Sequence, residues 1–379
     1  MKKILFVSID PASASRRMIN QINTAVEIGF SPEVITVKTA GITPPPNMEI
    51  DKIQYIVQKY KKGILRFLEF NFHLFLLLIR KDFDILFCRG LWVFPAVIPI
   101  KLVKRRPIIY DAHEYFMGHT TFNGRSAKRE IWRFVEKIAV KLSDALITVS
   151  EPIAEQYVKD YPELKDVYVI RNLPHKVDLP SFNKKEIYED SVKSVVFSGY
   201  LLPGRSLHNI IRAFSLINDK NIKLVIIGNG ILKKELVQLT AELGLNDSVT
   251  FKALLPNHQV IPALSHYDLG LSLIEADCLN RQFALPNKFF EYLSAGLPIL
   301  ASNIITQKAY MERYKVGKTI NPDTPETIAK AVREMLSDKI NYPIWQKNAF
   351  MAANELNWQN ESPKLKKIFK MYEEHSFAK

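Results

Sequence analysis

The sequence predicts an α/β protein built from two parallel-sheet domains. Short apolar runs rich in β-branched residues alternate with longer helical patterns, and this alternation is typical of a parallel sheet with crossover helices. The alternation stops near residue 172 and starts again at residue 194, which indicates two such units. The length of 379 residues also exceeds that of a usual single domain. We expect two domains that face each other across a cleft.

The first domain is expected over residues 1–172 and the second over residues 194–357. Residues 173–193 contain two prolines and mixed charges, which is typical of a linker. A helical pattern over about residues 358–379 has no strand after it. The apolar runs expected to form strands are residues 4–9, 31–37, 85–88, 107–110 and 145–149, then 194–198, 223–227, 249–252, 269–273 and 297–301.

The composition fits a globular protein, since 47% of the residues are hydrophobic and 24% are charged. Cys88 and Cys278 lie in apolar contexts without a CxxC motif, so neither a disulfide framework nor a zinc site is predicted. The apolar run after Met1 is too short for a signal peptide and fits a first strand. Asp82-Phe-Asp84 resembles a metal-binding pair, but turn formation explains it more simply. We expect a cytoplasmic protein without a metal or cofactor.

The net charge of +13 is concentrated in one segment. Residues 52–141 contain 18 basic and 7 acidic residues, which gives +11. Within this segment, residues 64–79 are mostly apolar and have basic residues on both sides. They fit either an interfacial helix on an anionic membrane surface, at the inner face of the cytoplasmic membrane, or a helix packed on the first sheet. No nucleic-acid-binding module is recognisable, so nucleic acid is not a predicted partner.

Residues 283–302 are the most informative segment because they combine a loop, a helix start and a short strand. Pro286 suits the first turn of a helix, and Gly296 suits a helix end. The free backbone donors of such a helix start attract an anionic group, to which Lys288 adds a full charge. Glu291 on this helix is either a ligand-binding carboxylate or an ordinary exposed residue.

This segment resembles the LPNK-x-x-EY-x-AxGxPV stretch of the retaining glycosyltransferases of family 4, in the group 1 branch of the GT-B superfamily. The resemblance implies that Glu291 holds the ribose of a nucleotide-sugar, and that Pro286 and Asn287 belong to the donor-binding segment. Family members often carry a second Glu eight residues earlier, where this chain has Phe283. The sugar contacts usually credited to that Glu are therefore in question.

Two further loops follow expected strands, where ligands of open parallel sheets bind. In the first, His113 follows residues 107–110, and its chemistry alone leaves open a structural, an exposed or a sugar-binding side chain. The resemblance implies that His113 touches the donor sugar, as in the family's D-x-H-E/D element. Neither Asp111 nor Glu114 is expected to act as a base.

The second loop lies within residues 197–214, where Gly199 lets backbone amides approach phosphates and Arg205 can form a charge-assisted contact. A solvated surface Arg205 is the alternative. This segment resembles the family's G-R-x-x-x-x-KG element, with Arg205 where the Lys usually stands and Tyr200 in place of the Arg. Lys288 is expected to compensate for that loss.

The turn at Gly228-Asn-Gly230 lacks the third glycine of a dinucleotide fingerprint, so it is weak evidence for NAD. It is similar instead to the family's IG-x-G turn near the nucleotide base. The resemblance therefore assigns Gly199, Gly228 and Gly230 to donor binding, beside Glu291, Asn287 and Pro286. His113, Arg205 and Lys288 are the expected catalytic residues.

The resemblance spans nearly the whole chain and implies a GT-B fold of two Rossmann-like domains. The first would take the acceptor and receive the returning C-terminal helix, and the second would bind the nucleotide-sugar. The implied reaction moves a sugar from a nucleotide diphosphate sugar to a hydroxyl acceptor, with retention and front-face attack. A lipid-linked or saccharide acceptor in cell-envelope or surface polysaccharide synthesis is expected. The alternatives are a non-catalytic nucleotide-sugar-binding partner subunit and a GT-B sugar-nucleotide epimerase.

Overall fold

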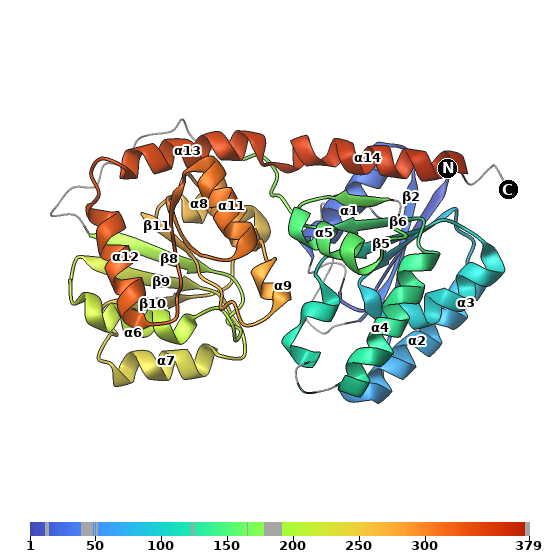
Figure 1. The fold of residues 1–379 in the computed structure, drawn as a ribbon, viewed down its shortest axis with the longest axis horizontal. Coiled ribbons are helices and arrows are strands. Elements are labelled where there is room, and N and C mark those ends of the chain that lie inside the picture. The colour runs from blue at the N-terminus through green and yellow to red at the C-terminus, as the bar shows by residue number, and fades with distance from the viewer. Residues whose placement is uncertain are drawn as a thin grey trace. The chain divides into compact units, whose positions relative to one another are not determined.

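The computed structural model of the chain describes residues 1–11, 15–38, 48, 50, 52–122, 124, 126–164, 166–177 and 192–375. The chain divides into two compact units, which are described separately below (Figure 1). Unit 1 comprises Met1–Asn172 and Trp358–Lys379, and unit 2 comprises Leu173–Asn357. The expected linker over residues 173–193 lies largely outside the described residues.

Unit 1 contains a seven-stranded parallel sheet in the order β3-β2-β1-β4-β5-β6-β7. The parallel sheet is confirmed, but β3 and β7 were not predicted from the sequence. Strand β5 also runs two residues further than predicted, so Asp111 lies within the strand and not in the loop after it. The strands are β1 (Lys3–Ser8), β2 (Ser31–Val37), β3 (Lys52–Ile56), β4 (Ile85–Arg89), β5 (Ile108–Ala112), β6 (Ala145–Thr148) and β7 (Val167–Val169).

Helices cover both faces of this sheet. On one face, alternate strand residues such as Phe6 and Phe87 pack against α1 and α14, where Phe369 contacts the ring of Phe87. On the other face, Tyr110 of β5 packs its ring against Phe94 of α3. The helices of unit 1 are α1 (Arg16–Glu27), α2 (Gly63–Arg80), α3 (Phe94–Lys104), α4 (Ser126–Leu142), α5 (Glu151–Asp160) and α14 (Trp358–His375).

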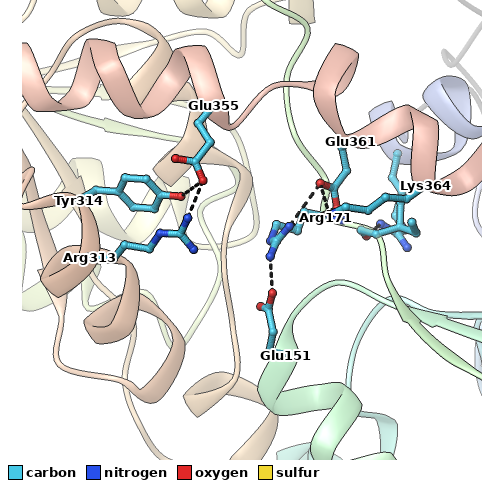
Figure 2. A network of polar contacts seen from close by, with 9 residues as sticks. Glu151, Arg171, Arg313, Tyr314, Glu355, Glu361 and Lys364 are labelled. Atoms are coloured by element: carbon cyan, nitrogen blue, oxygen red, sulfur yellow. Dashed lines mark hydrogen bonds and ion pairs between the residues drawn. The ribbon is translucent and has the colours of Figure 1, made fainter.

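The C-terminal helix α14 is held to unit 1 by ionic contacts as well as apolar packing. Figure 2 shows Glu361 of α14 beside Arg171. Unit 1 is formed by two chain segments, and Arg171 is the second-last residue of the first one, Met1–Asn172. The backbone amide of Arg171 donates to Glu361 Oε1 at 2.9 Å, and the guanidinium of Arg171 contacts both Glu361 and Glu151. These contacts fix the segment that leaves unit 1 against the helix that returns to it.

Helix α2 has one buried and one exposed face, and its contact with a membrane stays a prediction. Phe70, Leu74 and Leu78 are buried, and the side chain of Asn71 bonds to the backbone of Trp92 and Ala96 at 3.1 Å. The opposite face leaves apolar side chains exposed, namely Ile64, Leu65, Leu68, Phe72 and Ile79. Among the described residues, no helix is both long enough and apolar enough to span a membrane.

Unit 2 contains a six-stranded parallel sheet in the order β10-β9-β8-β11-β12-β13. Of these strands, only β13 was not predicted. The strands are β8 (Lys193–Ser198), β9 (Ile222–Ile227), β10 (Val249–Lys252), β11 (Leu269–Ser272), β12 (Ile299–Ser302) and β13 (Gly317–Ile320). The helices are α6 (Leu207–Ile217), α7 (Lys233–Glu242), α8 (Asn257–Leu264), α9 (Leu279–Gln282), α10 (Asn287–Ser294), α11 (Ile305–Tyr314), α12 (Pro325–Ser337) and α13 (Tyr342–Glu355).

The sheet of unit 2 has a separate apolar core on each face. Val195 and Phe197 of β8 belong to the core that includes α6 and α12, whereas Val196 between them belongs to the core that includes α8, α10 and α13. This two-sided burial explains why the strands are apolar throughout. Together, the two units give the α/β architecture of two Rossmann-like domains that the sequence predicts.

Candidate functional site

The candidate site in unit 2 lies where β8, β9 and β11 end, since loops at the carboxyl ends of parallel strands bind ligands. Helix α10 lies beside these strand ends. The hydroxyl of Tyr292 accepts a hydrogen bond from the backbone amide of Ser198 at 3.0 Å and lies 3.2 Å from the carbonyl of Leu271. The ring of Tyr292 packs where a side chain on Gly270 would be. These contacts hold α10 against the ends of β8 and β11.

Gly199 is the point where the predicted cationic residues meet. Its φ of +125° suits glycine, and it is the first residue after β8. A Cβ at this position would lie 3.8 Å from Arg205 Nη1 and 3.8 Å from Lys288 Nζ. The structure thus brings Gly199, Arg205 and Lys288 together although 83 residues separate Arg205 from Lys288 in sequence.

Lys288 holds its ammonium group in an apolar pocket. The residue is 6% exposed, and Nζ lies 3.1 Å from the centroid of the Phe197 ring. Nζ is buried and has no hydrogen-bond partner among the described residues. Burial and then the charge of Arg205 lower the pKa of Lys288 well below its usual value, while Glu291 acts in the opposite direction.

Arg205 is half-buried and forms no ion pair within the described part of the chain. Burial and then the charge of Arg281 lower its pKa, but a guanidinium remains charged at neutral pH. Arg205 is therefore only partly exposed to solvent. Arg205 on the loop after β8 and Lys288 on α10 thus meet at Gly199 without an anionic partner among the described residues.

Helix α10 begins one residue later than predicted. Pro286 is the N-cap, and Asn287 is the first helical residue. The predicted alternative of an exposed Glu291 is wrong, because this side chain is only 8% exposed. The side chains of the six residues from Lys288 to Leu293 are all buried, so α10 is an internal helix. Glu291 lies one turn after Lys288 on this helix.

Gly228 and Gly230 shape the loop after β8 from the neighbouring strand. A Cβ on Gly228 would lie 2.0 Å from the carbonyl oxygen of Gly199, and one on Gly230 would lie 2.3 Å from that of Leu201. The missing side chains allow Gly199 N to donate to Ile227 O and Leu201 N to donate to Asn229 O, both at 2.9 Å. The two glycines therefore position the loop that carries Gly199.

Arg281 is a residue of this site that the sequence analysis missed. Its guanidinium occupies the space where a side chain on Gly204 would lie, and it pairs with Asp277 at 2.6 Å. The nearby Glu275 accepts a hydrogen bond from the amide of Ser206 at 3.2 Å. These contacts brace the loop that contains Arg205. No motif marks Arg281, so only the fold reveals its role.

The two departures from the family motifs have different environments. Phe283 is 6% exposed, and its carbonyl accepts a hydrogen bond from Thr306 Oγ1 at 3.0 Å. Tyr200 is 52% exposed in the loop after β8. Phe283 is thus part of the apolar interior, whereas Tyr200 leaves its ring accessible.

His113 belongs to unit 1 and lies just after β5. Its ring packs against Gly90, where a Cβ would lie 3.5 Å from His113 Cε1. Nδ1 is buried without a hydrogen-bond partner in the described chain. Burial and then the charge of Arg89 lower the pKa of His113, so the imidazole is neutral at neutral pH.

The acidic neighbours of His113 are engaged elsewhere. Asp111 is buried and accepts hydrogen bonds from Arg17 and Gln21 of α1, with Arg17 Nη2 at 2.5 Å from Oδ1. Glu114 contacts His119 at 3.0 Å. Burial disfavours ionised Glu114, but the hydrogen bond from His119 and nearby positive charges outweigh it and hold its pKa at about 2. Neither carboxylate bonds to His113.

Arg89, the last residue of β4, is a second residue that sequence analysis missed. Its Nε and Nη1 atoms are buried and have no hydrogen-bond partner among the described residues. The short run Cys88-Arg89-Gly90 carries no motif, so Arg89 could not be identified from the sequence.

No group of three or more His, Cys, Asp or Glu side chains in the described part of the chain is arranged to hold a metal ion. At Asp82-Phe-Asp84, the carboxylate of Asp84 accepts a hydrogen bond from the amide of Lys3 at 2.8 Å. Asp84 also lies 3.8 Å from Arg106. This aspartate ties the start of β4 to β1, as expected for a structural turn.

Two family models match the chain, one in each half. The model for Glycosyltransferase Family 4 matches residues 14–173, and that for Glycosyl transferases group 1 matches residues 180–351. An uncharacterized glycosyltransferase of Methanocaldococcus jannaschii is 24% identical over 277 residues, which cover 68% of this chain and 67% of the relative. The O-antigen chain mannosyltransferase of Salmonella typhimurium is 25% identical over 219 residues, which cover 55% of this chain and 56% of the relative.

The fold is also similar to that of solved structures. The Anabaena protein HepE, in a structure with UDP-glucose, superimposes with a TM-score of 0.73 at 15% identity. The match covers 98% of this chain and 100% of that protein. At this level of identity the likeness concerns the fold.

Proposed function

The chain belongs to the group 1 glycosyltransferases with a GT-B fold, and we propose that it moves a sugar from a nucleotide diphosphate sugar to a hydroxyl acceptor with retention of configuration. The proposal rests above all on Arg205 and Lys288, two cationic side chains that meet beside Gly199 without an anionic partner among the described residues. A nucleotide diphosphate would supply the anionic partner that both side chains lack.

Catalysis in this proposal depends on stabilising the leaving group. Negative charge grows on the diphosphate as the glycosidic bond breaks, so cations placed beside it act more strongly in the transition state than in the ground state. Their apolar surroundings increase this effect, because charges interact more strongly away from water. In a front-face reaction the departing diphosphate also helps to take the acceptor proton, so no protein nucleophile is needed.

The other predicted residues are assigned to donor binding. Buried Glu291 would accept hydrogen bonds from the ribose hydroxyls, and the start of α10 at Pro286 and Asn287 would face the anionic part of the donor. Gly228 and Gly230 would act through the loop that they position. His113, neutral at neutral pH, would share a hydrogen bond with a hydroxyl of the donor sugar.

The acceptor and membrane proposals rest on separate support. The O-antigen mannosyltransferase relative suggests a saccharide acceptor on a lipid carrier in surface polysaccharide synthesis. The exposed apolar face of α2 suggests how unit 1 would reach such an acceptor. We place this face on an anionic membrane surface, at the inner side of the cytoplasmic membrane, because basic residues surround it.

The donor proposal is tested by incubating the protein with a panel of nucleotide-sugars and measuring both binding and release of nucleoside diphosphate. Arg205→Ala should lower turnover by roughly 10²-fold with a smaller effect on donor binding. Arg212→Ala, an exposed arginine on α6, should leave both unchanged. A variant that changes only the Michaelis constant would exclude a leaving-group role for Arg205.

Two further variants separate the roles within the site. Arg205→Ala combined with Lys288→Met should cost less than the sum of the single effects if both side chains act on one diphosphate. Glu291→Ala should weaken donor binding by roughly 1.5–3 kcal/mol, the usual value of a charged hydrogen bond. Donor binding without release would indicate the partner-subunit alternative, and an epimerised sugar would indicate the epimerase.

A further inference from the structure

We propose that Arg89 forms a second anion-binding site, at the carboxyl end of the sheet of unit 1, and that this site holds an anionic group of the acceptor. The inference rests on the proposed function, because it names the chemistry of the molecule that receives the sugar. It involves different residues from the donor site, since Arg205, Lys288 and Glu291 all belong to unit 2.

Arg89 occupies a position at which parallel strands present ligand-binding side chains. It is the last residue of β4 and aligns with Ser8 of β1 on one side and Asp111 of β5 on the other. Paired residues of adjacent parallel strands point to the same face, so Arg89 lies on the face that α1 covers. After Arg89 the chain turns at Gly90, whose φ is +77° and whose amide donates to the carbonyl of Asp111 at 3.0 Å.

The guanidinium of Arg89 forms no ion pair among the described residues, and two of its three acidic neighbours are already bonded. Asp111 is engaged by Arg17 and Gln21, and Glu114 is engaged by His119. Nε and Nη1 of Arg89 are buried without an acceptor in the described chain. A buried donor without an acceptor raises the free energy of the folded protein. A ligand that supplies the acceptor removes this cost, and the free energy regained favours its binding.

The chemistry of the site favours one anionic group. A planar guanidinium matches the oxygens of a phosphate or a carboxylate. Asp10 and Glu114 also act on Arg89 electrostatically, which limits the positive potential and disfavours a polyanion. An acceptor with a phosphate or with the carboxylate of an acidic sugar fits these features.

The test uses the full chain with Arg205→Ala and Lys288→Met, so that the donor site no longer competes for anions. Phenyl phosphate and glucuronate are titrated separately by ligand-detected NMR. Adding Arg89→Met should weaken binding of the preferred probe at least tenfold. Arg80→Met removes an exposed arginine of the same unit and should change nothing. Preference for phenyl phosphate would indicate a phosphate-bearing acceptor, and preference for glucuronate an acidic sugar.

Failure of this inference can be distinguished from failure of the proposed function. Binding of UDP, GDP and ADP is measured in the otherwise unchanged chain with and without Arg89→Met, and the variant should match the unchanged chain. Nucleoside diphosphate binding without any anion binding in the double-variant background would overturn the Arg89 site alone. Equal probe affinities with and without Arg89→Met would also overturn it. If Arg89→Met loses its circular dichroism signal, the variant is unfolded and Arg89→Lys is tested in its place. Added to the double variant, Arg89→Lys should weaken binding of the preferred probe severalfold.

Discussion

Lys288 is a buried side chain whose protonation would respond to an anionic ligand. Its ammonium group lies over the Phe197 ring with no hydrogen-bond partner in the described residues. Burial and the charge of Arg205 both lower its pKa in the free protein. An anionic ligand would raise that pKa again, so ligand binding and protonation of Lys288 are thermodynamically linked.

We predict that nucleoside diphosphate binding takes up protons through Lys288. The bound state holds the Lys288 proton more tightly, so affinity should fall as pH rises through the lowered pKa of the free protein. Calorimetric titrations above pH 7 in two buffers with different ionisation enthalpies would measure the number of protons taken up. Lys288→Met should abolish the uptake while leaving the protonation of the diphosphate itself unchanged. Equal uptake by both proteins would contradict the prediction.

Glu136 of α4 is a buried carboxyl group outside the candidate site. It accepts hydrogen bonds from the hydroxyls of Tyr157 at 2.9 Å and Tyr161 at 2.8 Å. Burial nevertheless raises its pKa to about 7. Because the folded state retains this proton more tightly than the unfolded state, the stability of unit 1 should fall as pH rises from about 4.5 to about 7.

The loss of stability attributable to Glu136 should be on the order of 3 kcal/mol above pH 7. Hydrogen exchange of amides in β5 and β6, compared at pH 5 and pH 8 after correction for intrinsic rates, would report it for unit 1 alone. Glu136→Gln should remove most of this pH dependence. Glu130→Gln, at an exposed position on the same helix, should preserve it. A variant at Glu136 with the full pH dependence would show that another group is responsible.

At the residue scale, the sequence singled out three residues that the fold brings together, but it did not reveal their surroundings. Gly199, Arg205 and Lys288 follow recognisable turn and helix-start patterns, and the fold brings them together. Arg281 and Arg89 follow no local pattern, because their importance comes from contacts and burial set by distant segments. Burial of Glu291 was equally hidden, since an amphipathic pattern does not show how many neighbours will cover a short helix.

Helices α2 and α4 contact each other and both expose apolar side chains. The rings of Phe67 on α2 and Trp132 on α4 lie 5.2 Å apart, and Figure 1 shows the two helices on the same side of the sheet of unit 1. On the same two helices, Leu68 and Phe72 of α2 and Phe134 of α4 are exposed. An apolar surface of this kind with basic neighbours is typical of a membrane-binding face.

We predict that this face binds vesicles containing anionic lipid and that binding weakens as salt rises. Lys62→Gln with Arg129→Gln should weaken binding, since each basic residue near such a surface contributes about 1 kcal/mol, or roughly fivefold. Co-sedimentation with vesicles would measure this. Lys220→Gln with Lys347→Gln makes the same charge change in unit 2 and should have little effect. Failure of the unchanged protein to bind anionic vesicles at low salt would refute membrane docking.

Among the strands, the central ones were predictable from the sequence, whereas three of the four edge strands were not, β10 being the exception. The central strands β1, β4, β8 and β11 are buried almost throughout, so their apolar runs are clear in the sequence. The strands β3, β7 and β13 are at the edges of their sheets and are short. Residues such as Lys52, Gln54 and Lys318 interrupt their apolar pattern because edge strands are partly solvated.

At the scale of the whole molecule, the chain enters unit 2 after Asn172 and leaves it after Asn357. Unit 1 is therefore assembled from two chain segments, and its core requires the second one. Trp358, Leu365, Ile368 and Phe369 of α14 are buried in that core. The contact of Arg171 with Glu361 joins the two segments (Figure 2).

We predict that Phe369→Ala destabilises unit 1 by about 3–5 kcal/mol, the usual cost of removing a buried aromatic ring. Hydrogen exchange should show faster opening of β1 and β4, whose core residues Phe369 contacts, without a matching change in β8 and β11. Lys370→Ala alters the adjacent exposed position and serves as the control. Equal loss of protection in both units would show that they do not unfold independently.

The two-segment construction of unit 1 has a consequence during protein synthesis. The ribosome completes every strand of the first sheet early, but α14, which covers one face of that sheet, is translated after all of unit 2. Unit 2 is encoded in one stretch and can form its two cores while one face of the unit 1 sheet is still uncovered. The second half of the chain is thus the first to reach its finished structure, and the nascent first half presents an open apolar surface to chaperones until the last helix emerges.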